Sequence, residues 1–166
     1  MSWDAIHSSA SNEWRTPPAF FKALDQEFGF DLDAAATEHN ALCQRFISYS
    51  QNSLATDWHA IGSTKPTVWL NPPYGRQVGK WIAKAILEAS LGCAVVVLTM
   101  ACTDTRWFKQ AWEAASEVRL VSGRLSFLTV DGKKAGTAPK GSAVFVFKPS
   151  QEHEREPLVS LVEYGR

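Results

Sequence analysis

Thr67-Val68-Trp69-Leu70-Asn71-Pro72-Pro73-Tyr74 joins a short apolar run to an amide, two prolines and an aromatic residue. Residues 67–70 predict a buried strand that ends at the amide. Each proline fixes its own φ near roughly −65° and keeps the preceding residue out of the helical region, so the corner after the strand is rigid before any ligand binds. A plainer interpretation is also open, in which the prolines only end the strand and begin a turn.

The corner formed by Asn71, Pro72, Pro73 and Tyr74 combines hydrogen-bond acceptors with an aromatic ring. An amine attached to an aromatic ring is a poor nucleophile, because its lone pair is delocalised into that ring. If the side-chain oxygen of Asn71 and the carbonyl of Pro72 each accept one N–H, positive charge that develops on the nitrogen is stabilised in advance. Tyr74 can stack on the ring that carries the amine. The corner therefore predicts a site that alkylates a nitrogen without first removing a proton.

Strands and helices alternate on both sides of this corner. Downstream, apolar residues at helical spacing predict a helix from Val78 to Gly92, and the valine-rich run 93–99 predicts a strand covered on both faces. A further helix starts near Thr105, and strands are expected at 118–121, 124–130 and 142–147, the last two paired antiparallel around the loop 131–141. Upstream, the pattern predicts a helix from the N-cap Thr16 to Gly29, a strand at 30–33, a short helix over 34–42 and a strand at 45–49.

This alternation predicts an α/β fold, with a doubly wound and mostly parallel sheet and an antiparallel hairpin near the C-terminus. In such sheets ligands bind outside the carboxyl ends of the strands. Asp33, Asn71 and Thr99 each lie at or just past the carboxyl end of a predicted strand. The candidate site therefore falls where the fold would place one.

The composition fits a single domain over residues 1–166, in which 149–166 form a charged tail. With 166 residues, 45% of them apolar, the chain can bury a sizeable core. No basic-then-apolar leader opens the sequence and the longest apolar run, 94–98, is far too short to span a bilayer, which predicts a soluble cytoplasmic protein with no membrane partner. The three cysteines are widely spaced and the four histidines are scattered, so we expect neither a disulfide framework nor a metal site.

The net charge is zero, but the charges are segregated along the chain. Residues 1–64 hold three basic against eight acidic residues, whereas residues 65–148 hold twelve against five. The acidic part suits a cationic cofactor and the basic part suits phosphates, although an ordinary solvated surface gives the same pattern. Candidates for DNA contact follow the corner or lie in the loop 131–141: Arg76, Lys80, Lys84, Lys133, Lys134 and Lys140. Trp14 and Trp58 are candidates for stacking on a base, since the other tryptophans mostly fit core faces.

Six short pieces of sequence occur in one order between residues 12 and 148. They are Trp-Arg-Thr-Pro at 14–17, Phe-Asp-Leu-Asp-Ala-Ala at 30–35, Asp-Trp at 57–58, Asn-Pro-Pro-Tyr at 71–74, Thr-Asp-Thr-Arg-Trp-Phe at 103–108 and Gly-Arg-Leu-Ser-Phe at 123–127. In this order they resemble the phage and prophage DNA N-6-adenine methyltransferases of the Dam family, and together they are far more specific than any single piece. The resemblance implies a single-domain, Rossmann-like class I methyltransferase fold. It also implies S-adenosyl-L-methionine as the donor, the N6 amine of a flipped-out adenine in double-stranded DNA as the acceptor, and a phage- or prophage-encoded protein in a bacterial host.

The resemblance also implies residue roles. Asn71, Pro72, Pro73 and Tyr74 match the motif that holds the target base. For the cofactor, it implies Trp14, Thr16, Pro17, Asp33, Ala34, Asp57 and Asn71. Structural roles stay open for some of these, since Thr16 and Pro17 also suit a helix start, and Asp33 and Asp57 also suit caps. The glycine-rich turn common among class I methyltransferases is absent, and Asp33-Ala34-Ala35-Ala36 stands in its place.

Three functions are compatible with the sequence. The first is methylation of adenine in DNA, the second is methylation of RNA or of a protein glutamine by the same motif, and the third is a catalytically silent domain that binds nucleic acid. The sequence determines neither the DNA recognition site nor the choice between a monomer and a homodimer.

Overall fold

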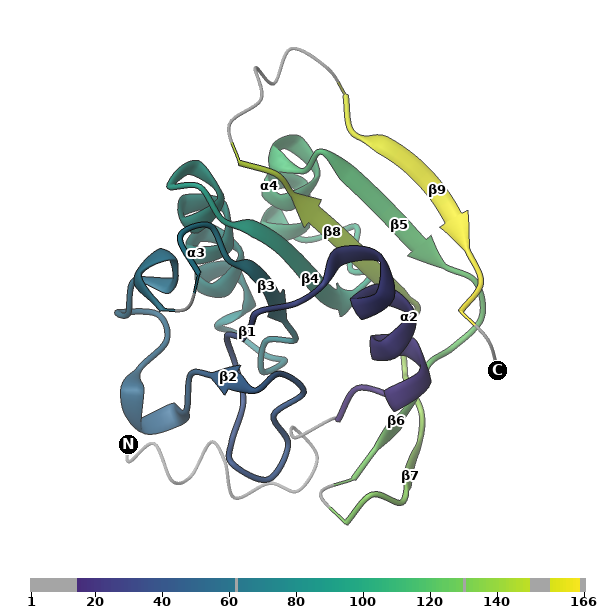
Figure 1. Ribbon diagram of the computed structural model, residues 1–166. Coiled ribbons are helices and arrows are strands. Elements are labelled where there is room, and N and C mark those ends of the chain that lie inside the picture. The colour runs from purple at the N-terminus through teal and green to yellow at the C-terminus, as the bar shows by residue number, and fades with distance from the viewer. Residues whose placement is uncertain (1–14, 62, 130, 150–155, 165–166) are drawn as a thin grey trace.

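A seven-stranded sheet forms the centre of the molecule in a computed structural model, which describes residues 15–61, 63–129, 131–149 and 156–164 (Figure 1). The strands are β1 (Leu32–Asp33), β2 (Arg45–Phe46), β3 (Thr67–Leu70), β4 (Ala94–Met100), β5 (Glu117–Val121), β8 (Ser142–Phe147) and β9 (Leu158–Val162). Their order across the sheet is β2-β1-β3-β4-β8-β5-β9. The strands β1 to β4 are parallel, β8 runs antiparallel to both of its neighbours, and β9 is parallel to β5. The predicted α/β class with a mostly parallel sheet is confirmed.

Helices cover both faces of this sheet (Figure 1). One face carries α3 (Val78–Ser90) and α4 (Arg106–Ala114), and the other carries α2 (Pro18–Phe28) together with a hairpin of β6 (Ser126–Leu128) and β7 (Lys134–Thr137). The central strand β4 serves both cores, because Val95 and Val97 pack beneath α3 and α4 whereas Val96 and Leu98 pack on the other side. Burial on both faces explains why this strand is a continuous apolar run.

The helix boundaries follow local capping signals. The helix α2 begins one residue later than predicted, with Pro17 instead of Thr16 as its N-cap, and it ends at Gly29, whose φ of 62° lets its N–H reach the carbonyl of Asp25. Thr105 caps α4, since its side-chain oxygen accepts the N–H of Phe108 at 3.2 Å. No helix in the described part of the chain is long and apolar enough to cross a membrane.

The antiparallel hairpin forms with a different partner from the one predicted. The strand β6 pairs with β7, which lies inside the expected loop 131–141, and not with residues 142–147. Those residues form β8, which inserts between β4 and β5 and is buried along its whole length. A continuous apolar run is better satisfied at the centre of a sheet covered on both faces than in an exposed hairpin.

Two other segments differ from the prediction. The short helix expected over 34–42 is absent, because the carboxylate of Asp33 accepts the N–H groups of Ala35 and Leu42 and so competes with helical hydrogen bonds. The charged tail contains β9, and the ring of Tyr164 just beyond it packs edge-on against Phe20 with 4.5 Å between centroids. The loop before β3 contains the single-turn helices η1 (Tyr49–Gln51) and η2 (Trp58–Ala60).

The order of the strands reverses at β1. From β1 the chain passes to β2 on one side and afterwards to β3 on the other side. Such a reversal is the topological switch point, where open α/β sheets bind ligands outside the carboxyl ends of their strands. The ends of β1 and β3 are in contact there, because the N–H of Ala34 donates to the carbonyl of Trp69 at 2.9 Å. Asp33 and Asn71 therefore flank the switch point.

Candidate active site

Asn71 directly follows β3 and is joined to the N-terminal part of the described chain. Its side-chain Nδ2 donates to Oγ1 of Thr16 at 3.1 Å, and Thr16 is 4% exposed. This bond fixes the rotation of the amide and turns its oxygen away from Thr16. The fold thus brings together two residues that the sequence proposed separately, one for the target base and one for the cofactor.

The corner after Asn71 packs against the β6–β7 hairpin. The ring of Tyr74 lies nearly perpendicular to that of Phe127 on β6, with 6.2 Å between centroids. The backbone of Arg15 forms two hydrogen bonds with Leu128, the next residue along β6, at 2.9 and 3.0 Å. The motif, the segment before α2 and the hairpin therefore meet in one place. No role was predicted for Phe127, although its position in the last of the six sequence pieces was an available signal.

Two buried hydroxyl groups lie at the ends of β3 and β4. Within the described residues, the hydroxyls of Tyr74 and Thr99 have no hydrogen-bond partner. Burial raises the pKa of the Tyr74 hydroxyl well above its ordinary value, and the nearby Cys102 thiol raises it further. Buried polar groups are almost always paired, so hydroxyls at this edge of the sheet are groups that a bound ligand or ordered water can satisfy.

Asp33 ends β1 and is only 3% exposed. Its two carboxylate oxygens accept the N–H of Ala35 at 3.2 Å and of Leu42 at 3.1 Å. Burial raises the pKa of Asp33 to about 6, although both backbone bonds act in the opposite direction. The carboxylate therefore fixes the loop 34–42 beside the switch point and places a titratable negative charge there.

Asp57 and Trp58 precede β3 and lie in different surroundings. Asp57 is exposed and immediately precedes η2, where its side chain makes no capping hydrogen bond. Trp58 is fully buried, and its indole N–H donates to both the carbonyl and the hydroxyl of Ser53. The hypothesis that Trp58 stacks on a base is wrong, because its ring belongs to the core beneath α3. Trp14, the other candidate for stacking and for the cofactor, lies outside the described residues.

Most of the basic candidates for DNA contact lie at the same edge of the sheet as Asn71. The strand β5 runs in the same direction as β3 and β4, so the hairpin that follows it projects from their carboxyl edge (Figure 1). Lys133 and Lys134 are exposed at the turn of this hairpin. Lys140 is also exposed and lies near the start of β8, with Nζ 3.5 Å from the Sγ of Cys102. Arg76 is exposed just before α3, and Lys80 is exposed in the first turn of that helix.

Lys84 is not a phosphate ligand in this fold. It is 8% exposed, and its Nζ lies 2.6 Å from Oε1 of Glu88, whose side chain is fully buried. The other oxygen of Glu88 is 2.9 Å from Nδ1 of His59. Burial alone would raise the pKa of Glu88, but the hydrogen bonds from Lys84 and His59 outweigh it and hold that pKa below its ordinary value. The sequence spacing placed Lys84 on the same helical face as Lys80 but could not show that Glu88 pairs with it.

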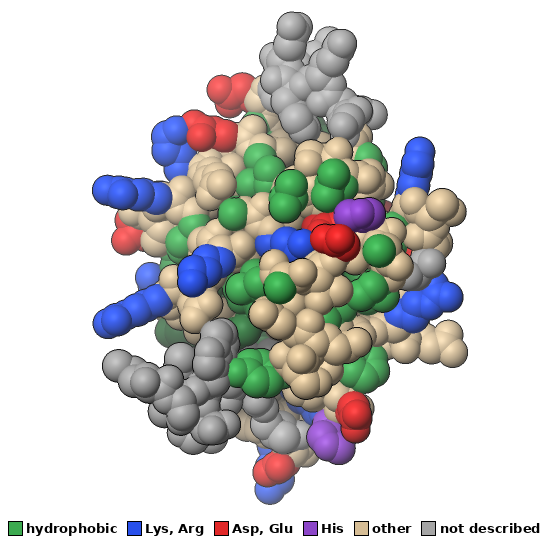
Figure 2. Space-filling model, turned by 90° about the vertical axis from the view of Figure 1, so that its left-hand side faces the viewer, with side chains coloured by type: hydrophobic (Ala, Val, Ile, Leu, Met, Phe, Trp, Pro, Cys, Tyr) green, Lys and Arg blue, Asp and Glu red, His purple; other side chains and the backbone are tan. Residues whose placement is uncertain are grey.

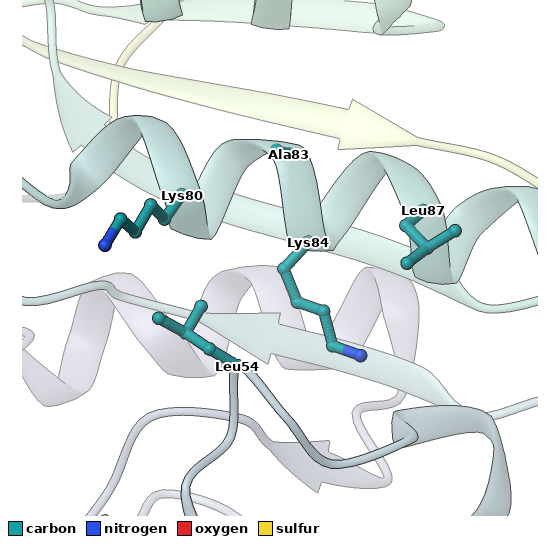
Figure 3. Close-up of a pocket in the computed structure, with 5 residues that line it drawn as sticks. All are labelled: Leu54, Lys80, Ala83, Lys84 and Leu87. Atoms are coloured by element: carbon teal, nitrogen blue, oxygen red, sulfur yellow. The ribbon is translucent and has the colours of Figure 1, made fainter.

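A pocket of about 340 Å³ lies between α3 and the loop at Leu54 (Figure 3). Lys80, Ala83, Lys84 and Leu87 line it from α3, and Figure 3 shows the two lysines extending in different directions from the helix. Figure 2 shows that basic, acidic and histidine side chains meet near the middle of one side of the molecule, among hydrophobic side chains. No residue of the Asn71–Tyr74 corner lines this pocket, so it is separate from the candidate active site.

The switch point carries one buried charge and a buried polar group. Among the described residues, no group of three or more His, Cys, Asp and Glu side chains could hold a metal ion. Asp33 supplies a buried negative charge, and the hydroxyl of Thr99 is buried without a hydrogen-bond partner in the described part of the chain. A doubly wound sheet with an Asn-Pro-Pro-Tyr corner at its switch point is the arrangement that the resemblance to Rossmann-like amino-group methyltransferases implies.

Comparisons with known proteins agree with this class. The model of the DNA N-6-adenine-methyltransferase (Dam) family matches residues 5–164. The chain belongs to this family, and the resemblance in the sequence is confirmed. It is 34% identical over 158 residues to the DNA N-6-adenine-methyltransferase of Escherichia phage T1. The aligned region covers 85% of this chain and 64% of the phage protein. It is 31% identical over 170 residues to the DNA N-6-adenine-methyltransferase of Haemophilus phage HP1, which covers 98% of this chain and 95% of that protein.

Proposed function

We propose that the protein transfers a methyl group from S-adenosyl-L-methionine to the N6 amine of adenine in double-stranded DNA. The observation that carries this proposal is the Asn71–Tyr74 corner at the switch point, in a chain of the Dam family. The family and the names of the phage relatives support DNA as the substrate class. They favour DNA over RNA or a protein glutamine, and an enzyme over a catalytically silent domain.

The target base must leave the duplex to reach this corner, at a cost of a few kcal/mol. In our proposal, the Asn71 oxygen and the Pro72 carbonyl each accept one N–H of the adenine amine, and Tyr74 stacks on the base. The bond from Asn71 to Thr16 holds the amide in the orientation that this requires. The cofactor, when bound, supplies the electrophilic methyl group. Charge that develops on the amine is stabilised by acceptors already in place, so no side chain has to remove a proton beforehand. The methylated amine loses one proton to solvent after the transfer, and the leaving group is S-adenosyl-L-homocysteine.

The proposed cofactor site lies between the ends of β1 and β3. The residues proposed to contact the cofactor around the switch point are Thr16, Pro17, Asp33, Ala34 and Asn71. Asp57 and Trp14 are added to these cofactor contacts on the resemblance alone. Asp33 acts in this proposal in two ways: its backbone hydrogen bonds shape the loop 34–42, and its charge favours the cationic amino group of the cofactor.

The charge state of Asp33 predicts a pH dependence of cofactor affinity. With a pKa of about 6, its carboxyl group is ionised above that pH and protonated below it. We therefore expect affinity for S-adenosyl-L-homocysteine to fall as the pH decreases through this value, by up to about tenfold per pH unit. Calorimetry over a pH series measures this. Asp33→Asn should bind more weakly at neutral pH and lose the dependence, and an unchanged profile in that variant would remove Asp33 from the cofactor's electrostatics.

The hairpin lysines predict the salt dependence of DNA binding. Lys133→Ala combined with Lys134→Ala should reduce the slope of log affinity against log salt by up to about 2, because each phosphate contact contributes roughly one unit. The matched control is Lys65→Ala with Lys148→Ala, since both lysines are exposed but lie at the opposite, amino edge of β3 and β4. If the two double variants have equal slopes, the hairpin does not contact DNA.

The proposed reaction is tested by measuring which acceptor receives the methyl group. Radiolabelled methyl transfer from S-adenosyl-L-methionine should appear in adenine of duplex DNA and be absent from RNA and from a glutamine-containing peptide. Label in RNA or peptide instead would support the second function, and binding of DNA without cofactor affinity would support a silent domain. Single-molecule sequencing of the methylated DNA then identifies the recognition site.

A further inference from the structure

The strand β9 forms an unusually apolar edge of the sheet (Figure 1). It contains no charged residue, and Leu158, Val159 and Leu161 are 68%, 44% and 73% exposed. Within the described residues, no other segment pairs with its outer side. The opposite edge, β2, has only two residues and carries the exposed Arg45. Proteins usually shorten or charge their edge strands to prevent pairing, and β9 shows neither device along its length.

The backbone of β9 presents its free hydrogen-bonding groups at two residues. The N–H of Leu158 donates to Ser116 and the carbonyl of Val162 accepts from Ser122, so residues 158, 160 and 162 direct their backbone groups toward β5. Alternate residues of a strand direct these groups to opposite sides. Val159 and Leu161 therefore direct their N–H and C=O groups away from the sheet.

We propose that β9 pairs antiparallel with β9 of a second copy of this chain, centred on Ser160. The sequence Leu-Val-Ser-Leu-Val is self-complementary in this register, since Val159 of one copy lies opposite Leu161 of the other and Leu158 lies opposite Val162. The two outward-facing residues of each copy then form four backbone hydrogen bonds across a two-fold axis. The exposed apolar side chains are covered at the same time.

The flanking residues select this register. A slip in one direction places Pro157, which has no N–H, opposite Leu161 and loses a hydrogen bond. A slip in the other direction places the charged Glu163 opposite Val159. With Ser160 on the axis, Pro157 and Glu163 both lie outside the four hydrogen bonds. Pairing of the edge strands alone makes a small interface, so the dimer should dissociate on dilution.

The two-fold axis is perpendicular to the joined sheet, so the carboxyl edges of the two copies face opposite directions. Each candidate active site stays open, and dimerisation is not required for methyl transfer by either copy. The two proposals can therefore fail separately, one measured by molecular mass and the other by activity.

The register is tested by crosslinking of the full-length chain. In an antiparallel pair centred on Ser160, the two copies of this residue form a non-hydrogen-bonded pair with Cα atoms about 4.5 Å apart, within the range that a disulfide spans. Ser160→Cys should therefore form a disulfide dimer under mild oxidation at least about ten times faster than Leu158→Cys, whose two copies would lie roughly 13 Å apart. The unmodified chain, with its own three cysteines, gives the background rate. Equal rates in the two variants would overturn the register.

The interface itself is tested by sedimentation equilibrium over a concentration series. The mass of the wild-type chain should rise from monomer to dimer, and Leu158→Lys with Leu161→Lys should remain monomeric. Both residues are more than half exposed, so this double variant should fold and retain methyl transfer. Leu87→Lys with Leu91→Lys, which changes two exposed leucines at the C-terminal end of α3 and just beyond it, should dimerise as the wild type does. A wild-type monomer at every concentration, or a dimer that survives the β9 substitutions, would refute the proposal.

Discussion

Asn71→Ala should lower kcat/KM for methyl transfer by at least about a hundredfold, because it removes a fixed acceptor from the place where charge develops on the amine. Binding of S-adenosyl-L-homocysteine should stay within a few-fold of the wild-type value, since Asn71 is proposed to act mainly on the base. Radiolabelled transfer into duplex DNA and calorimetry measure the two quantities. Loss of cofactor affinity with intact transfer to DNA at saturating cofactor would reverse the roles assigned to Asn71 and Asp33.

Substitutions at two residues near Asn71 distinguish the chemical role of its amide from the role of the residues that hold the amide in place. Thr16→Val removes the acceptor of the Asn71 Nδ2 bond but keeps the amide, so a smaller loss of transfer, about tenfold, is expected. Tyr74→Phe removes only a buried hydroxyl that has no partner among the described residues and keeps the stacking ring, so activity should be close to wild type. A Tyr74→Phe variant as inactive as Asn71→Ala would give the hydroxyl a role that stacking does not explain.

Lys84→Met should destabilise the fold by about 3–5 kcal/mol, the second large effect that we expect. Methionine preserves most of the buried stem but leaves Glu88, which is fully buried, without the lysine that pairs with it. Urea unfolding measures the change in free energy. The difference in unfolding free energy between the variant and the wild type should narrow as the pH falls toward and below the ordinary pKa of a carboxyl group. Without Lys84, burial raises the pKa of Glu88, and once protonated this residue no longer carries an unpaired charge.

The matched control for this experiment is Lys80→Met, one helical turn earlier on α3. Lys80 is exposed, so its substitution should change stability by less than about 0.5 kcal/mol. If Lys84→Met were instead harmless to stability and reduced the salt dependence of DNA binding, Lys84 would be a phosphate contact after all and its pairing with Glu88 would be incidental.

Elements with strong local signals could be predicted from the sequence. The period of apolar residues defines α3, the valine run defines β4, and Thr105 marks the start of α4. Partners in the sheet could not be read in this way. The strands β6 and β8 coincide with predicted strands, whereas β7 lies in a segment predicted as a loop. Their pairing depends on which strand is covered on both faces, and that is decided by the whole core.

The candidate site likewise has one part that the sequence predicts and another part that it does not. The corner Asn71–Tyr74 and its place after a strand follow from four adjacent residues, because proline stiffness and amide chemistry are local properties. Burial is not local. Trp58 and Lys84 were candidates for nucleic-acid contact by residue type, but both belong to the packed interior beside Glu88.

By itself, the sequence determined the α/β class, the family and the position of the Asn71–Tyr74 corner after a strand, since each rests on short-range pattern or on the order of motifs. The tertiary structure alone decided that Thr16 holds the amide of Asn71, that Phe127 packs on Tyr74, and that the tail supplies the edge strand β9. These features join residues far apart in the chain. Their contacts depend on burial and strand order, which arise only when the two faces of the sheet are covered together.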